Sequence, residues 1–314
     1  MATQTTSAQK PRLERLRQQK TQSLLAFLLM VAQGGITVTG SIVRVTGSGL
    51  GCNTWPNCHE GSLVPVAGAA PWIQQLIEFG NRLLTFALIA IAIALFISVL
   101  QRRKEIIVYA LLQCFGIVVQ AVIGGISVHL DLKWWAVALH FLPSMILVWL
   151  AAVLWVRVKQ PDEGTPRVII PSSLRALAVF GAFLLSIVLV TGTMVTGAGV
   201  HAGDTGVGME GRLDVDLGLM AHIHAWVMYV YLAVTIVLVG ALVAKKAPAN
   251  LQRNGWLLII MIVVQAAVGI LQFRLGVPRW TVPVHIGLCS FVVACCAVLW
   301  AQGKVREVQE PRVQ

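Results

Sequence analysis

The chain has 314 residues, of which 57% are hydrophobic and 12% are charged, and its mean hydropathy is +0.79. A soluble domain of this length cannot bury so much apolar surface, so the composition indicates an integral membrane protein. The formal net charge of +11 does not indicate a nucleic-acid partner here, because Lys and Arg gather on the cytoplasmic loops of membrane proteins.

Eight apolar runs are each close to the ~20 residues that a membrane-spanning helix needs. We expect helices at about 22–44, 77–100, 106–128, 134–156, 172–196, 218–243, 255–275 and 281–302. Most of the 24 basic residues fall before the first run, after every second run and at the C-terminal end. This distribution predicts that both termini are cytoplasmic, and that the long loops at about 45–76 and 197–217 lie outside.

The first outer loop contains Cys52 and Cys58 in "GLGCNTWPNCHEG". Two closely spaced cysteines on the oxidising side of a membrane favour a disulfide. Two free thiols are the main alternative, and a zinc site that includes His59 is a weaker one, because four ligands are not in view. The remaining cysteines lie inside apolar runs, where we expect small core residues: Cys114, Cys289, Cys295 and Cys296.

The chain contains an internal repeat. Gln120 in "VVQAVIGG" and Gln265 in "VVQAAVGI" are 145 residues apart, and the same separation relates His140 to His285. The segment "VTGSIVRVTGSG" (38–49) also resembles "VTGTMVTGAG" (190–199). We therefore expect two parallel four-helix halves, although transporters are duplicated in this way too.

The repeat divides the chain into five parts. These are a basic cytoplasmic tail (1–21), an N-terminal half (22–156), a cytoplasmic linker (157–171), a C-terminal half (172–302) and a cytoplasmic tail (303–314).

The two halves differ in the polar residues of their second helices. Asn81 stands opposite His224, and Glu78 precedes Asn81 by one helical turn. Histidines inside membrane spans are rare and usually face the bundle interior, and a pair of them on two helices can clamp a haem iron. Ordinary interhelical hydrogen bonds are the alternative for His140, His224 and His285.

Neighbouring polar residues are less easily assigned. His222 projects about 200° away from His224 on a helix, so we expect it to meet a neighbouring helix or the interface. Glu78 could exchange a proton beside a porphyrin, or could form an i, i+4 ion pair with Arg82. Both interpretations of Glu78 stay open. We expect three further histidines to be solvated loop residues, with contact to a substrate as the alternative for each: His59, His129 and His201.

These segments resemble the haem A synthases of bacteria and mitochondria over about 22–302. The resemblance depends on "VTGSIVRVTGSGLGC" before the paired cysteines, "IEFGNR", "ALHFLPSM", "HIHAW" and "VPVHIG", together with the eight runs in two repeats. The combination is specific, whereas no single segment is decisive.

The resemblance implies a membrane oxidoreductase that oxidises the C8 methyl group of haem O to a formyl group, in two hydroxylations with loss of water. The product, haem A, serves terminal haem-copper oxidases. By this resemblance the C-terminal half holds a haem b between His224 and His285. The N-terminal half takes haem O, with His140 on its iron and Glu78 as the catalytic carboxylate. Haem O synthase, an unidentified electron donor and the plasma membrane are the implied partners.

The chain departs from the family at two places. Asn81 stands where many members have a histidine, so we expect His140 alone, or His140 with another residue, to hold the substrate iron. The loop 197–217 lacks the second cysteine pair of some members. The rival interpretations are a non-catalytic haem carrier or b-type electron-transfer cytochrome, which has no use for Glu78, and a transporter without a chromophore.

Overall fold

The computed structural model describes residues 14, 17–201 and 211–308. Residues 202–210 of the expected outer loop lie outside this part, as do three residues of the basic tail and one near the C-terminal end: Lys10, Arg12, Arg15 and Arg312.

Eight long helices make up nearly all of the described chain. They are α2 (Gln19–Val45), α3 (Trp72–Ser98), α4 (Lys104–His129), α5 (Trp134–Val158), α6 (Ser172–Ala198), α7 (Leu217–Ala244), α8 (Ala249–Arg274) and α9 (Thr281–Gln302). All eight are long and apolar enough to cross a membrane. The expected all-α membrane fold is therefore confirmed, with the largest boundary errors at the starts of α3 and α8.

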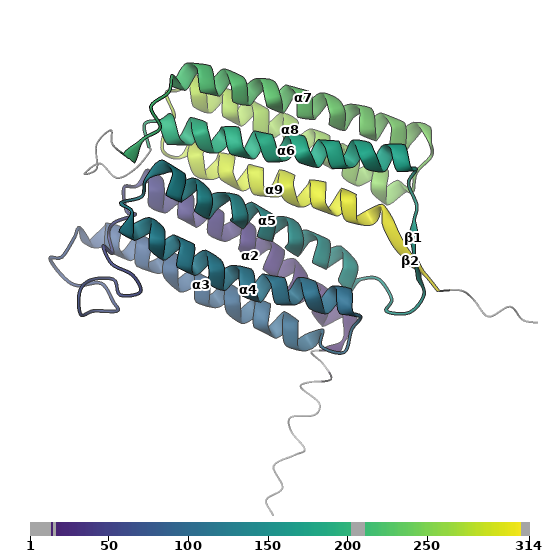
Figure 1. Ribbon diagram of the computed structural model, residues 1–314, viewed down its shortest axis with the longest axis horizontal. Helices are drawn as coiled ribbons and strands as arrows, with labels where there is room; N and C mark the ends of the chain where they lie inside the picture. The colour runs from purple at the N-terminus through teal and green to yellow at the C-terminus, as the bar shows by residue number, and fades with distance from the viewer. Residues whose placement is uncertain (1–13, 15–16, 202–210, 309–314) are drawn as a thin grey trace, which may run out of the picture.

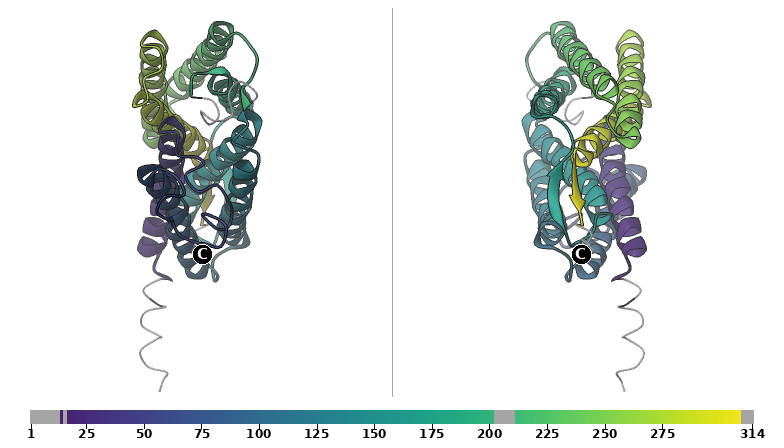
Figure 2. Two further views of the ribbon diagram at one scale, coloured as in Figure 1. Left: turned by 90° about the vertical axis from the view of Figure 1, so that its left-hand side faces the viewer. Right: turned by 90° about the vertical axis from the view of Figure 1, so that its right-hand side faces the viewer.

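The helices form two groups that lie side by side, α2–α5 and α6–α9 (Figure 1). The contact between the groups involves α2 and α5 on one side and α6 and α9 on the other. A polar contact at this seam joins Thr37 of α2 to Ser290 of α9, whose hydroxyl oxygens are 2.9 Å apart. The start of α2 and the end of α9 lie at the same end of the molecule, and the loop 46–71 lies at the other (Figures 1 and 2).

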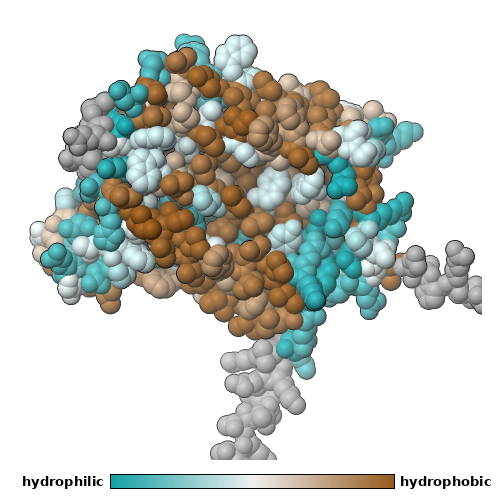
Figure 3. Space-filling model, in the orientation of Figure 1, coloured by the Kyte–Doolittle hydropathy of each residue, from teal (hydrophilic) through white to brown (hydrophobic). Residues whose placement is uncertain are grey.

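The outer surface of the helices is apolar. Hydrophobic residues form a broad band across the space-filling view, and hydrophilic residues gather toward its two ends (Figure 3). Side chains within the band are large and exposed, for example Phe86 (69% exposed) and Phe115 (64%). Such a surface is stable in contact with lipid but not with water. The apolar residues of the spanning helices therefore need not all face the protein core.

Two short strands join the linker to the C-terminal segment, a feature that the sequence did not predict. β1 (Thr165–Val168) pairs antiparallel with β2 (Lys304–Glu307). Nearby, the buried Arg157 donates to the carbonyl oxygens of Ala301 (2.9 Å) and Lys304 (2.8 Å). The end of the chain is thus fastened to the connection between the two helix groups.

Candidate functional site

The imidazole of His224, on α7, is held by a threonine of α6. Its Nδ1 lies 3.0 Å from the hydroxyl oxygen of Thr191, which also donates to the carbonyl of Ile187 at 2.9 Å. A hydroxyl has one hydrogen, so when it goes to the carbonyl the oxygen accepts from Nδ1–H. The other ring nitrogen, Nε2, then keeps a lone pair for a metal, the usual arrangement of a ligating histidine.

His285, on α9, is the second histidine of this half. The side chain of Gln265, on α8, donates to the backbone carbonyl of His285 at 3.0 Å and so fixes the two helices at this level. The Nδ1 of His285 is buried and has no hydrogen-bond partner in the described part of the chain. Such an orphaned nitrogen fits a site that is completed by a bound group.

Both rings lie against glycines. A Cβ on Gly192 would be 3.2 Å from Cε1 of His224, and a Cβ on Gly269 would be 3.0 Å from Cε1 of His285. Only a residue without a side chain lets the imidazoles approach the neighbouring helices this closely. The sequence therefore specifies the ring positions as well as the histidines.

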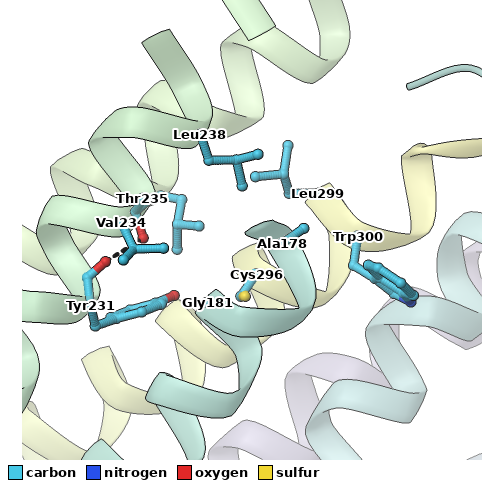
Figure 4. A pocket seen from close by; sticks show the side chains of 10 residues that line it. Ala178, Gly181, Tyr231, Val234, Thr235, Leu238, Cys296, Leu299 and Trp300 are labelled. Carbon is cyan, nitrogen blue, oxygen red and sulfur yellow. Dashed lines mark hydrogen bonds between the residues drawn. The ribbon is translucent and has the colours of Figure 1, made fainter. Parts of the chain in front are cut away.

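The interior below these histidines is incompletely filled. One cavity is lined by Met228 and Cys289, each one helical turn from a histidine, and by Gln265. A second cavity lies further along the bundle, and Figure 4 shows Tyr231 and Cys296 converging on it. The Tyr231 hydroxyl is buried without a described partner. The packing of this half is therefore loose one helical turn from the histidines, but the cavities, at about 30 and 20 Å³, are much smaller than a ligand pocket.

His140, on α5, has nearly the same environment as His285. A Cβ on Gly124 would lie 3.2 Å from its Cε1, and the Gln120 side chain donates to its carbonyl at 2.7 Å. Its Nδ1 is also buried without a partner among the described residues. The pattern of glycine, glutamine and histidine is thus present in both helix groups.

Asn81, on α3, is placed as His224 is, but with a smaller side chain. Thr39 donates to its Oδ1 at 2.7 Å, the counterpart of the Thr191 contact to His224. A Cβ on Gly40 would meet no atom within 4 Å, whereas one on Gly192 would meet the histidine ring. The N-terminal half therefore has free space where the C-terminal half has an imidazole.

Glu78 connects α3 to the loop 46–71. One carboxylate oxygen forms an ion pair with Arg82 at 2.6 Å, and the other accepts from the backbone N–H of Cys52 at 2.7 Å. Arg82 donates in turn to the carbonyls of Cys52 and Asn57, both at 3.1 Å. Cys52 and Cys58 are joined in a disulfide, as expected. The i, i+4 pair is therefore present, and it clamps the disulfide loop over the helix.

The loop contains a buried polar network that sequence reasoning missed. His59 is 8% exposed, and its ring nitrogens contact Asn53 Oδ1 (3.0 Å) and Gln75 Oε1 (2.8 Å), so the expectation of a solvated residue is wrong. One feature of the sequence does point to this network: Gln75 lies one helical turn before Glu78, so the two side chains share a helix face. No group of three or more His, Cys, Asp or Glu side chains in the described residues could hold a metal ion, so the zinc alternative has no support.

The outlying histidines contact neighbouring segments. The ring of His222 packs edge-on against Phe273 of α8, with 6.3 Å between centroids, as expected for a residue that meets a neighbouring helix. His201 Nε2 lies 2.9 Å from the carbonyl of Val277, and its own carbonyl accepts from Arg44 of α2 at 2.8 Å. These contacts link the outer ends of the helices.

Comparison with known proteins places the chain in a family. The profile of the COX15-CtaA family, described as cytochrome oxidase assembly protein, matches residues 21–297. A Heme A synthase of Bacillus licheniformis is 24% identical over 307 residues, covering 91% of this chain and 98% of that protein. A Heme A synthase of Exiguobacterium sibiricum is 29% identical over 182 residues, covering 56% of this chain and 58% of that protein. The chain therefore belongs to the COX15-CtaA family of cytochrome oxidase assembly proteins, the family of the heme A synthases.

Proposed function

We propose that this protein is a haem A synthase of the plasma membrane, which oxidises the C8 methyl group of haem O to a formyl group. The observation that carries the proposal is the repeated histidine environment. His140 and His285 share a facing glycine and a glutamine bond to the backbone, and Asn81 and His224 share a threonine partner. Two related sites that differ in one ligand suit a protein with one resident porphyrin and one porphyrin substrate.

In this proposal His224 and His285 hold a resident haem b. The orphaned Nδ1 of His285 and the glycines against both rings support this assignment. A haem b bound by two histidines supplies single-electron transfer. The residues of this half bind and orient it, and the surrounding apolar helices exclude water.

The N-terminal half is the proposed substrate site. His140 binds the iron of haem O, and Asn81 leaves the other side open where a second imidazole would fit. Glu78 is the proposed catalytic carboxylate, which would stabilise positive charge that develops at the oxidised methyl carbon or hold a proton there. The proposal also includes the arrangement expected from the sequence. The two halves are parallel repeats, both termini are in the cytoplasm, and the disulfide loop is outside.

One observation favours the rival function, a haem-binding protein without catalysis. Both oxygens of Glu78 are already engaged, by Arg82 and by the backbone of Cys52, as in a purely structural ion pair. The two functions make different predictions for extracted haem. Cells that express this chain with a source of haem O should contain haem A, whereas a carrier would leave haem O unchanged.

The resident haem can be tested with a matched pair of glycine variants. Gly192→Val should push the His224 ring from its place and abolish the low-spin haem b spectrum of the purified protein. Gly40→Val has free space at the corresponding position and should keep that spectrum. Equal haem b content in the two variants would contradict the assignment of the C-terminal half.

A further inference from the structure

The segment 63–73 runs from the disulfide loop into the first two residues of α3 and has an unusual composition. It reads "LVPVAGAAPWI" and contains no charged side chain, and the indole of Trp72 is its one side-chain hydrogen-bonding group. Its large side chains are exposed: Leu63 by 67%, Val64 by 54% and Val66 by 39%. A continuous apolar stretch with this exposure is unfavourable in water and marks a contact surface.

The exposed stretch continues into the lipid-facing surface of α3. In the first turns of that helix, Trp72 is 52% exposed, Ile73 71% and Leu76 47%. The loop folds back onto this part of the helix, because the buried Gln75 side chain binds both backbone polar groups of Val66. The apolar side chains of the loop therefore lie beside a helix end that faces lipid.

Two residues of the exposed stretch have both of their backbone polar groups paired within the protein. The N–H and C=O of Val66 pair with the Gln75 side chain at 2.9 and 3.0 Å. The N–H and C=O of Val64 pair with the Ser62 hydroxyl at 3.3 and 2.8 Å. A loop in water has no need of such partners, whereas a segment in contact with acyl chains does.

We propose that segment 63–73 inserts into the lipid leaflet at this end of the helices and contacts acyl chains. Lipid is the occupant that the observations favour, because the surface is uncharged, continues a membrane-facing helix, and has the backbone groups of Val64 and Val66 paired within the protein. Trp72, at the junction, is the residue type that anchors membrane interfaces. The loop that contacts Glu78 through Cys52 is then attached to the bilayer. The inference does not depend on the reaction proposed above.

Photo-crosslinking tests the contact directly. Benzoylphenylalanine is placed at Val64 in the full-length protein, and in a matched variant at Glu60, an exposed charged residue of the same loop. Each protein is reconstituted in dioleoyl-phosphatidylcholine vesicles, irradiated and analysed by mass spectrometry. Native membranes are irradiated in parallel, and unfolding temperatures confirm that both variants fold like the parent.

The expected result is a phospholipid adduct at position 64, in vesicles and in native membranes, and at least a tenfold lower yield at position 60. The uncharged surface should crosslink equally in vesicles with and without anionic lipid. Equal lipid yields at the two positions, or no lipid adduct at position 64, would overturn the proposal. A protein adduct in native membranes with no lipid adduct in vesicles would also overturn it, and would identify a docking surface for a protein instead.

Discussion

Replacing Glu78 by Gln separates its two possible roles. The change keeps the size of the side chain and an acceptor for the Cys52 N–H, but removes the charge that pairs with Arg82 at 2.6 Å. Hydrogen bonds to charged groups contribute about 1.5–3 kcal/mol, so we expect the free energy of unfolding to fall by about that amount. We also expect haem b to be retained and haem A to be nearly lost, with haem O or a hydroxylated intermediate accumulating.

The matched control is Arg82→Gln, which breaks the same ion pair and leaves the carboxylate in place. It also removes the donors to Cys52 and Asn57, so it should destabilise the loop at least as much as Glu78→Gln. Unfolding is measured by detergent titration, and haems are extracted and separated by chromatography from cells with matched amounts of haem b-loaded protein. If Glu78 acts on the substrate, Glu78→Gln makes less haem A than Arg82→Gln. Wild-type haem A yield from Glu78→Gln would refute the catalytic role.

Three other predictions concern the ligands and the disulfide. His224→Ala and His285→Ala should each remove the low-spin spectrum of the purified protein, and normal spectra in both would show that the resident haem lies elsewhere. Asn81→His should create a second bis-histidine site and double the low-spin haem per protein, because its environment already matches that of His224; an unchanged ratio would contradict the equivalence of the sites. Non-reduced peptide mass spectrometry should detect Cys52 linked to Cys58, and free thiols in protein prepared without reductant would rule the link out.

Hydropathy located the spans well because a bilayer imposes one length and one composition on every spanning helix. It placed the starts of α3 and α8 too late, since residues 72–76 and 249–254 include polar side chains that lower the local hydropathy while continuing the helix. The β1·β2 pair could not be predicted, because its two strands of four residues are far apart in the chain and carry no distinctive pattern.

The sequence also singled out the histidines and Asn81 as candidate site residues, because polar residues inside apolar helices are conspicuous and the expected repeat aligned them. It did not identify what holds them. The threonine partners, the facing glycines and the contact between Glu78 and the Cys52 backbone depend on how helices pack. A backbone N–H donor in particular cannot be recognised from the sequence, because every residue except proline has one.

The fastening of β2 to the linker has a consequence for synthesis of the protein. Arg157 lies in the last turn of α5, yet two of its acceptors, the carbonyls of Ala301 and Lys304, belong to residues translated about 145 positions later. During translation the first helix group is complete long before these carbonyls emerge from the ribosome. The join between the halves can close only when the last spanning helix has been inserted, so in a nascent chain that stalls before residue 304 the two helix groups are not joined at this end of the molecule.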